Sequence, residues 1–281
     1  MLGAFAREYL AGRETRAAAT RRADRLAIGK MIDRFGPRRD IRTITVRELE
    51  AFRSRLLRSA SPVSVNLWFR HLRAFFSTAV RYELLPKSPF DRIRSEPEPE
   101  REYGLVAGEA LARLLACAGA RERRAVLFLL LTGLRPFEAV KATYGDIREG
   151  FLRVVGKRGK CRRVPITAEC AQVLGTGAPD EFLLPWRCAT TLSRVFKGLV
   201  RRAGLPESFR LYDCRHTAGT AFTMAGVDTT TAMRILGHST VKAHERYIHV
   251  SAEHLEKAML RVREIYGLGA CRGGEPHPDR G

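Results

Sequence analysis

No stretch of this sequence is apolar enough to cross a membrane. A membrane-spanning helix needs about 18 consecutive apolar residues, whereas the longest apolar run, AVLFLLLTG, suits a buried core helix. The N-terminus also lacks the apolar segment of a signal peptide, because FAREYLAGRETRAAATRRADR is charged and has the pattern of an amphipathic helix. We therefore expect a cytoplasmic protein with no membrane partner. Its 281 residues suffice for one large domain or two ordinary ones.

Cysteine is scarce, and the six cysteines are scattered along the chain. They are Cys117, Cys161, Cys170, Cys188, Cys214 and Cys271. No two of them form a CxxC pair, so the sequence indicates neither a zinc site nor a disulfide framework. We expect no bound metal.

Acidic side chains are also few, with 30 Asp and Glu against 50 Lys and Arg, and the formal net charge is +20. Such an excess suits a polyanionic partner, because each phosphate that is neutralised releases counterions. Both halves of the chain are cationic, so both could touch the same partner. An arginine-rich composition inherited from a GC-rich genome is the alternative, and charge does not separate DNA from RNA.

Residues 1–94 predict a small helical bundle. Apolar residues recur at three- and four-residue spacing in FAREYLAGRETR, ADRLAIGKMIDRF, VRELEAFRSRLL and SPVSVNLWFRHLRAFFSTAVRYELL. The last stretch carries Leu67, Phe69, Leu72, Phe75, Phe76 and Val80. Residues 95–105 contain two prolines among closely spaced glutamates, which predict an extended, hydrated linker. Ten such residues reach roughly 30 Å, enough to pass around one side of a duplex.

Residues 106–267 predict a second domain, of mixed α type. Two helices are expected in AGEALARLLACAGARERRAVLFLLLTGL, and FLRVVGKRGKCRRVPI alternates around a Gly/Lys-rich turn as a β-hairpin does. Helical patterning then returns and continues to Gly267. The tail, residues 268–281, is expected to be disordered. The fold class is therefore mainly α, with a small β-hairpin or sheet in the second domain.

The segment LTGLRPFEAV places an arginine at a helix junction. Gly133 ends a hydrophobic helix, and Arg135 stands just before Pro136, which begins the next one. An arginine there can present a rigid fork of N–H donors to two phosphate oxygens. Glu138 follows at a distance that lets it orient the guanidinium. The alternative is a capping arginine followed by an ordinary first-turn acid.

The segment GKRGK places Lys157 at the tip of the predicted hairpin. A lysine there can enter a groove and donate a proton to a leaving oxygen. An exposed lysine in a basic turn is the ordinary alternative, and Arg158 and Lys160 compete for the same role.

The segment LYDCRHTAGTAFTMAG contains a second arginine near a helix start. Asp213 is expected to be the N-cap, which would put Arg215 in the first turn. The N–H groups and the dipole of a helix N-terminus favour an anion, although a solvated surface arginine remains an alternative.

The segment LGHSTVKAHERYIHV contains a histidine and a tyrosine in cationic surroundings. Gly237 is expected to end one helix, with His238 in the turn, and Ser239 and Thr240 to cap the helix that carries Tyr247. These residues alone allow two interpretations of His238, as a structural turn residue or as a catalytic residue. Tyr247 is either an amphipathic packing residue or a nucleophile.

Together, TGLRPFE, the GK of the hairpin, YDCRHT, LGHS and RYIHV resemble the sequence boxes of the tyrosine recombinases, the family that includes the Xer and phage integrase enzymes. The part ending RAFFSTAVRYELLPKSPFDRI is similar to the helical core-binding domain of that family. The resemblance implies a two-domain clamp on DNA. It would consist of a SAM-like core-binding domain (1–94), a linker (95–105) and a catalytic domain (106–267).

The resemblance also implies roles for individual residues. Arg135 and Arg215 match the two arginines that hold the scissile phosphate, and Glu138 matches the acid that supports the first of them. Lys157 matches the hairpin lysine that protonates the leaving 5′ oxygen. His238 matches a position that hydrogen-bonds the phosphate.

Tyr247 matches the nucleophile, but one neighbouring position departs from the family pattern. The family usually has histidine three residues before the second arginine, where this chain has Tyr212. His216 is itself common in the family and does not replace that histidine.

The implied function is site-specific DNA recombination through a 3′-phosphotyrosyl intermediate, with no cofactor. The expected partner is double-stranded DNA at a specific site, on which monomers assemble as a homotetramer across two synapsed sites, in the cytoplasm and associated with the nucleoid. Three alternatives remain. They are a nicking-closing enzyme like a type IB topoisomerase, a DNA-binding protein that has lost catalysis, and, more distantly, an RNA-binding module.

Overall fold

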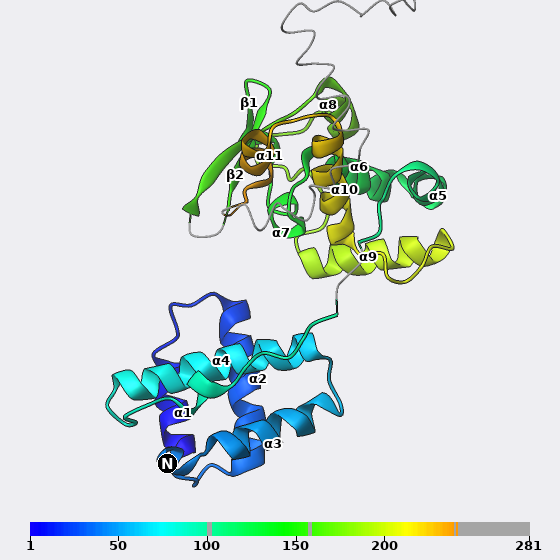
Figure 1. Cartoon of the computed structure of the whole chain (residues 1–281). Helices are drawn as coiled ribbons and strands as arrows, with labels where there is room; N and C mark the ends of the chain where they lie inside the picture. Colours follow the sequence, from blue (N-terminus) through cyan, green and yellow to red (C-terminus); the bar gives the residue numbers. More distant parts are fainter. Residues whose placement is uncertain (100–102, 157–158, 239, 241–281) are drawn as a thin grey trace, which may run out of the picture. The chain divides into compact units, whose positions relative to one another are not determined.

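The chain folds mainly into α-helices, with one small antiparallel sheet in its second half (Figure 1). The structure, a computed structural model, describes residues 1–99, 103–156, 159–238 and 240. The chain divides into an N-terminal unit, residues 1–101, and a C-terminal unit, residues 102–281. The predicted fold class is confirmed. Among the described residues, no helix is both long and apolar enough to cross a membrane.

The described helices of the N-terminal unit overlap the four stretches whose periodicity predicted them, with ends that differ by up to five residues. They are α1 Leu2–Ala11, α2 Ala18–Phe35, α3 Val46–Leu57 and α4 Pro62–Arg81, with two short 3-10 turns, η1 Ile41–Thr43 and η2 Pro89–Arg92. A capping box begins α3. The Thr45 hydroxyl accepts from the Glu48 N–H (3.2 Å), and the Glu48 carboxylate accepts from the Thr45 N–H (2.9 Å).

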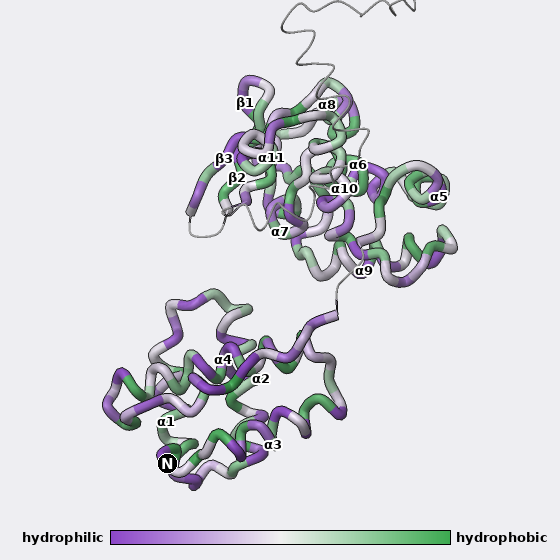
Figure 2. Tube along the Cα trace, viewed as in Figure 1, coloured by the Kyte–Doolittle hydropathy of each residue, from purple (hydrophilic) through white to green (hydrophobic). Residues whose placement is uncertain are grey.

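The core of the N-terminal unit is rich in aromatic rings. Phe75 and Phe76 of α4 are completely buried, and the ring centroid of Phe75 lies 4.8 Å from that of Phe5 in α1. Figure 2 shows hydrophobic and hydrophilic residues alternating along these helices. Leu67 belongs to the apolar pattern of α4 but is 41% exposed. It stands two residues from Phe69 and therefore points to the other side of the helix.

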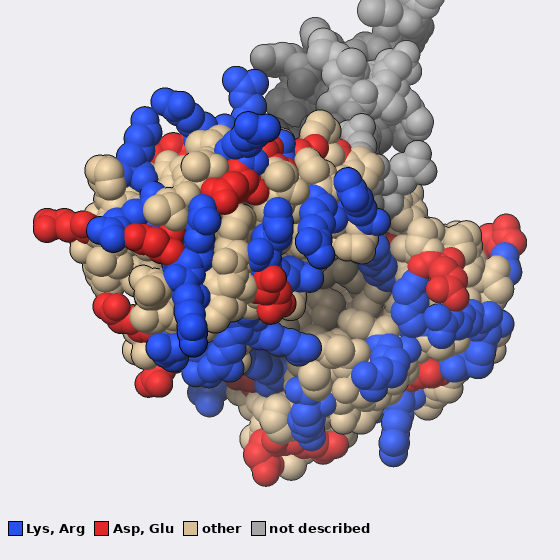
Figure 3. Space-filling model, turned by 90° about the horizontal axis from the view of Figure 1, so that it is seen from below, with Lys and Arg blue, Asp and Glu red and all other residues tan. Residues whose placement is uncertain are grey.

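Basic side chains dominate the charged surface. Lys and Arg cover much of the face seen in Figure 3, with fewer Asp and Glu among them, as the formal net charge of +20 requires. In the N-terminal unit, Arg70, Arg73 and Arg94 are exposed around one small pocket. A surface of this kind attracts phosphate groups.

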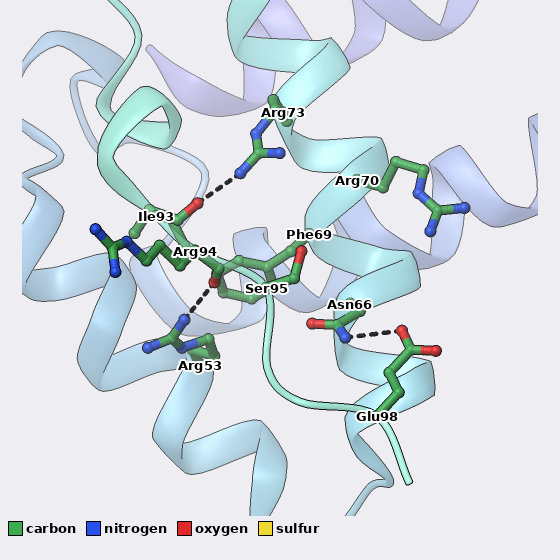
Figure 4. Close-up of a pocket in the computed structure, with 9 residues that line it drawn as sticks. All are labelled: Arg53, Asn66, Phe69, Arg70, Arg73, Ile93, Arg94, Ser95 and Glu98. Atoms are coloured by element: carbon green, nitrogen blue, oxygen red, sulfur yellow. Dashed lines mark hydrogen bonds between the residues drawn. The ribbon is translucent and has the colours of Figure 1, made fainter. Parts of the chain in front are cut away.

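The first part of the predicted linker lies against the helical bundle (Figure 4). The side-chain amide of Asn66, in α4, accepts from the Glu96 N–H (2.9 Å) and donates to the Glu96 carbonyl (2.9 Å) and to the Glu98 carboxylate (2.8 Å). Arg53 donates to the carbonyl of Arg94 at 2.6 Å. We call residues 93–98 the strap. The sequence predicted a hydrated linker from residue 95, whereas residues 95–98 are fastened because an amide offers the donor and acceptor that extended backbone needs.

The far end of the predicted linker is fastened to the C-terminal unit. Val106 is completely buried, and its N–H donates to the hydroxyl of Thr217 at 2.8 Å. Gly104 lies so close to the ring of Phe209 that a Cβ there would be 3.0 Å from it.

The C-terminal unit packs its helices against one face of its small sheet. Those described are α5 Gly108–Cys117, α6 Ala120–Thr132, α7 Pro136–Ala139, α8 Ala168–Leu174, α9 Ala189–Arg202, α10 Leu211–Met224 and α11 Thr229–Leu236, with the 3-10 turn η3 Tyr144–Asp146. The strands are β1 Ile147–Arg148, β2 Phe151–Val155 and β3 Cys161–Pro165. The helices predicted after α11 and the tail 268–281 lie outside the described residues.

β2 and β3 form the predicted hairpin. They pair antiparallel, with Leu152 opposite Val164 and Val155 opposite Cys161. Leu152, Val154 and Val164 are buried in the core of the unit, so the alternation of the sequence matches one inward face. β1 adds a third strand, which the sequence pattern did not predict because two residues are too few to show alternation.

The core of the C-terminal unit brings three helix ends together. α6 packs against α10, and α10 also packs against α11. Phe128 and Leu129 of α6 and Cys214 of α10 are buried in this core. The C-terminal ends of α6 and α11 therefore meet beside the first turns of α10, and the candidate site is built there.

Candidate active site

Gly133 allows the end of α6 to approach the end of α11 closely. Its φ is +62°, a left-handed conformation that favours glycine. A Cβ at this position would lie 2.6 Å from Cδ2 of Leu236, a completely buried side chain of α11. The chain then leaves α6 and reaches Arg135, directly before Pro136 at the first position of α7.

The predicted contact between Arg135 and Glu138 is present. Nη1 of Arg135 donates to Oε1 of Glu138 at 3.1 Å, and the Arg135 backbone N–H donates to Oε2 at 3.0 Å. The Glu138 side chain is fully buried, whereas that of Arg135 is 24% exposed. The guanidinium is therefore held at its base by the carboxylate while part of it faces solvent.

Arg215 lies at the centre of the same cluster and is 1% exposed. It donates through Nη1 to the carbonyl of Gly133 (2.6 Å) and through Nη2 to the carbonyl of Leu236 (2.5 Å). One buried arginine of α10 thus joins the ends of α6 and α11.

The expected start of α10 was wrong by three residues. The helix begins at Leu211, so Asp213 is its third residue instead of the N-cap, and its carboxylate accepts from the Arg210 N–H at 2.8 Å. An acid can cap a helix start from the N-cap position or from the third helical position. The sequence therefore did not show which of these positions Asp213 occupies. Tyr212 therefore occupies the first turn and Arg215 follows three residues later.

The turn after α11 carries His238 into the cluster. Gly237 has φ +68°, and the His238 N–H donates to the carbonyl of Met233 at 3.0 Å. Nη2 of Arg135 donates to the Gly237 carbonyl at 2.7 Å. The structure therefore brings Arg135, Glu138 and Arg215 to one turn, and the half-buried His238 is the next residue of that turn.

Tyr212 lies on the accessible side of α10. It is 38% exposed, and its ring centroid is 5.3 Å from that of His216. His216 is 4% exposed and its ring stacks 3.9 Å from that of Tyr103. His216 is therefore enclosed between the rings of Tyr103 and Tyr212.

Lys157 and Tyr247 lie outside the described residues, as do Arg158 and Ser239. The hairpin is described on both sides of Lys157, where the Gly156 N–H donates to the Lys160 carbonyl at 2.8 Å. The predicted role of Ser239 and Thr240 as helix caps also depends on the undescribed segment that begins at residue 241.

Arg162 joins this cluster, although none of the sequence motifs pointed to it. Nη1 and Nη2 donate to Oε1 and Oε2 of Glu138 at 2.9 and 2.7 Å, and Nε donates to the Ile235 carbonyl at 2.8 Å. The alternation of β3 contained the signal. Arg162 stands two residues before the buried Val164, on the inward face, and a charged residue there requires a buried partner.

Opposing effects set the pKa of Glu138. Burial raises it, while the hydrogen bonds and charge of Arg162, followed by those of Arg135, lower it, and the net shift of the pKa is downward. The carboxylate therefore stays ionised, and its negative charge faces the positive charges of Arg135 and Arg162. With Arg215 close by, positive charge exceeds negative charge among these four side chains, which suits an anionic ligand.

No metal site accompanies the cluster within the described part of the chain, where no three His, Cys, Asp or Glu side chains are grouped so that they could hold an ion.

Residues 107–254 match the model of the Phage integrase family, and the chain belongs to that family. The family resemblance drawn from the motifs is thus confirmed. The chain is 31% identical over 218 residues to a putative integrase of Pseudomonas phage Pf1, which covers 74% of this chain and 64% of the phage protein. It is 23% identical over 231 residues to the tyrosine recombinase XerD of Listeria innocua, covering 73% of this chain and 75% of that protein. The chain therefore spans slightly less than two thirds of the phage relative.

The fold is also that of a solved integrase. One chain of lambda integrase, solved as a tetramer bound to a Holliday junction, superimposes with a TM-score of 0.70 at 18% identity, over 85% of this chain and 76% of that one.

Proposed function

We propose that the chain is a site-specific DNA recombinase that cleaves and rejoins DNA strands through a 3′-phosphotyrosyl intermediate. The observation that carries the proposal is the convergence of Arg135 and Arg215 on the turn at Gly237. The same turn presents His238 and leads along the chain to Tyr247. Membership of the Phage integrase family supports this assignment.

The two arginines would hold the scissile phosphate. A guanidinium offers paired donors that match two phosphate oxygens, and fixed donors stabilise the charge that develops on the pentavalent transition state. Arg215 is locked by two carbonyls, and Arg135 is locked by Glu138 and Gly237. These contacts fix the direction of each guanidinium. His238 would add a hydrogen bond to a phosphate oxygen.

In the proposed reaction the phenolic oxygen of Tyr247 attacks phosphorus, and the bond from phosphorus to the 5′ oxygen breaks. Lys157 gives the departing 5′ oxygen a proton, and the phenolic proton passes to water. A free phenol has a pKa of about 10 and attacks poorly at neutral pH, so the positive field of the arginines must favour the phenolate. The tyrosyl ester conserves the phosphodiester bond energy, so a 5′ hydroxyl can rejoin the strand without a cofactor.

The proposed partner is double-stranded DNA at a specific recombination site. Residues 1–94 would be the core-binding domain and residues 106–267 the catalytic domain, which together would clamp the duplex. The basic surface in Figure 3 supports DNA binding. The fold shared with the lambda integrase tetramer on a Holliday junction supports a homotetramer on two synapsed sites. The protein would work in the cytoplasm, associated with the nucleoid where such DNA lies.

The test is covalent trapping on a nicked suicide substrate in the presence of EDTA. We expect the wild-type chain to give a shifted band on a denaturing gel, Tyr247→Phe to give none, and Tyr212→Phe to give a reduced one. Peptide mapping by mass spectrometry should place the DNA on Tyr247. An adduct on Tyr212 instead would overturn the assignment of the nucleophile.

A second substrate tests the proposed role of Lys157 as the proton donor to the leaving 5′ oxygen. Replacing the bridging 5′ oxygen by sulfur gives a leaving group that needs no proton, so this substrate should restore cleavage by Lys157→Ala. Failure of the sulfur substrate would move the acid role to another residue, such as Lys160.

The rival functions give different results in the same assays. A nicking-closing enzyme would form the adduct and relax a supercoiled plasmid but yield no recombinant product from two sites. A DNA-binding protein that has lost catalysis would bind the duplex and form no adduct on either tyrosine.

A further inference from the structure

Three arginines hold three consecutive carbonyl groups at the C-terminal end of α11. Nε of Arg162 donates to Ile235 (2.8 Å), Nη2 of Arg215 to Leu236 (2.5 Å) and Nη2 of Arg135 to Gly237 (2.7 Å). A helix leaves its last carbonyls without helical partners and carries partial negative charge there, so cations at this end are favourable. Two of these arginines have proposed roles on the phosphate, and Arg162 has none.

Arg162 also controls the carboxylate that orients Arg135. Each oxygen of Glu138 accepts two hydrogen bonds, one from Arg162 and one from Arg135. The Arg162 side chain is 12% exposed and lies under the last turn, where a Cβ on Gly237 would be 3.0 Å from its guanidinium carbon. The side chain is therefore enclosed between Glu138 and the turn that presents His238.

We propose that Arg162 is a positioning residue of the active site, which fixes Arg135 through Glu138 and fixes the α11 turn through the Ile235 carbonyl. The inference rests on the proposed function, because it concerns the same phosphate site. Arg162 itself does not touch the substrate.

The balance of charges explains why Arg135 depends on Arg162. With both arginines present, Glu138 shares its hydrogen bonds between them, and Arg135 uses one Nη1 hydrogen on the carboxylate. Without Arg162, the buried carboxylate lacks two donors, and the nearest guanidinium that can replace them is Arg135. Arg135 would turn its fork toward Glu138 and away from the phosphate, and a misplacement of about 1 Å can cost on the order of 100-fold in rate.

Arg162 also sets the protonation of Glu138. Burial raises the pKa of Glu138, and the largest opposing cause is the hydrogen bonding of Arg162. Arg135 faces the carboxylate as well, and Lys141, Asp146 and Arg153 line the adjoining groove. Because Glu138 has a depressed pKa, its ionised form persists until the pH falls below that value. Loss of Arg162 raises the pKa, so the carboxylate becomes neutral at a higher pH.

The experiment uses the full chain and compares single-turnover cleavage of the nicked substrate with affinity for the intact duplex. The variants are Arg162→Gln, Arg162→Lys, Glu138→Gln, the double variant Arg162→Gln/Glu138→Gln, and the control Arg163→Gln. Arg163 is the next residue of the same strand, but its side chain is 59% exposed and pairs with Glu149 at the surface. If only the loss of one positive charge from β3 mattered, Arg163→Gln and Arg162→Gln would have the same effect.

We expect Arg162→Gln to cleave about 100-fold more slowly, with duplex affinity changed no more than in Arg163→Gln. Its rate should fall as the pH is lowered from 8 to 5 more steeply than that of the wild type. The double variant should lack this extra pH dependence and be no slower than the slower single variant, because both changes act through one carboxylate. Arg162→Lys should lie between wild type and Arg162→Gln, since a lysine keeps the charge but cannot bind both oxygens.

Three results would overturn the inference: normal cleavage by Arg162→Gln, equal losses of cleavage and binding, or effects of the two single variants that multiply in the double variant. If thermal unfolding shows that Arg162→Gln does not fold, the same comparison with Arg162→Lys and Arg162→Lys/Glu138→Gln decides. The wild-type chain is assayed first. If it forms no adduct, the proposed function is wrong, whereas an adduct with the wild type and normal cleavage by Arg162→Gln would contradict only the role of Arg162.

Discussion

Replacing Gly133 by alanine tests the close approach on which the site is built. Gly133 has a left-handed backbone conformation, and the Leu236 side chain occupies the space that a Cβ at residue 133 would need. The leucine is completely buried, and its carbonyl is held by Arg215, so it has little room to move away. We expect Gly133→Ala to destabilise the C-terminal unit and to displace the end of α11.

Two contributions set the magnitude. A residue with a Cβ in the left-handed region costs roughly 1–2 kcal/mol. The contact of 2.6 Å between the new Cβ and Cδ2 of Leu236 forces an overpacked core, and overpacking costs typically about 1–3 kcal/mol. The sum, about 2–5 kcal/mol, is a large part of the roughly 5–15 kcal/mol that stabilises a domain.

Gly150 provides a matched control. Its φ is +74°, but a Cβ there would meet nothing within 4 Å, so Gly150→Ala should cost only the conformational part. The chain has two tryptophans, Trp68 in the N-terminal unit and Trp186 in the C-terminal unit. In a Trp68→Phe background, urea unfolding followed by fluorescence therefore reports on the C-terminal unit. Equal losses for the two alanine variants would refute the packing of Leu236 against Gly133.

The remaining predictions concern the grip on the phosphate, the residue that departs from the family, and the strap. Arg135→Lys should lose cleavage far more than duplex binding, because lysine keeps the charge without the fork; parallel losses would make it a residue that only positions the DNA backbone. Tyr212→His should stay active and cleave faster below pH 8 in single-turnover assays, whereas Tyr212→Phe should be partly impaired; an inactive histidine variant would contradict this. Asn66→Ala should speed cutting by trypsin between Arg94 and Ser95, followed by mass spectrometry, relative to the control Arg70→Ala, and equal rates would mean that the amide does not hold the strap.

Periodicity and turn chemistry sufficed for the elements that position the site. The four helices of the N-terminal unit, the hairpin of β2 and β3, and the junction at Gly133 and Pro136 all follow from local signals in the sequence. The contact between Arg135 and Glu138 was predictable because the two residues lie three apart at a helix start. The roles of the site residues remain proposals, and Lys157 and Tyr247 lie outside the described part of the chain.

What the sequence could not supply are contacts between residues far apart in the chain. Arg162 meets Glu138 across 24 positions, and Arg215 meets Gly133 across 82, so neither pair leaves a local pattern. The strap was missed for the same reason. Its prolines and glutamates are typical of a hydrated linker, but Asn66, 30 positions earlier, holds the Glu96 backbone on the bundle.

The buried cluster of Arg135, Glu138 and Arg162 is better explained by the site than by stability. Replacing a buried ion pair with packed apolar side chains is often neutral or stabilising by about 1–4 kcal/mol, so a fold that needed only stability would gain nothing from it. Geometry is what the cluster supplies. One carboxylate between two guanidinium groups separates like charges and fixes the direction of each fork, because all four acceptor positions of Glu138 are filled. In the proposed phosphate site, this arrangement would hold positive charge in place before the DNA arrives.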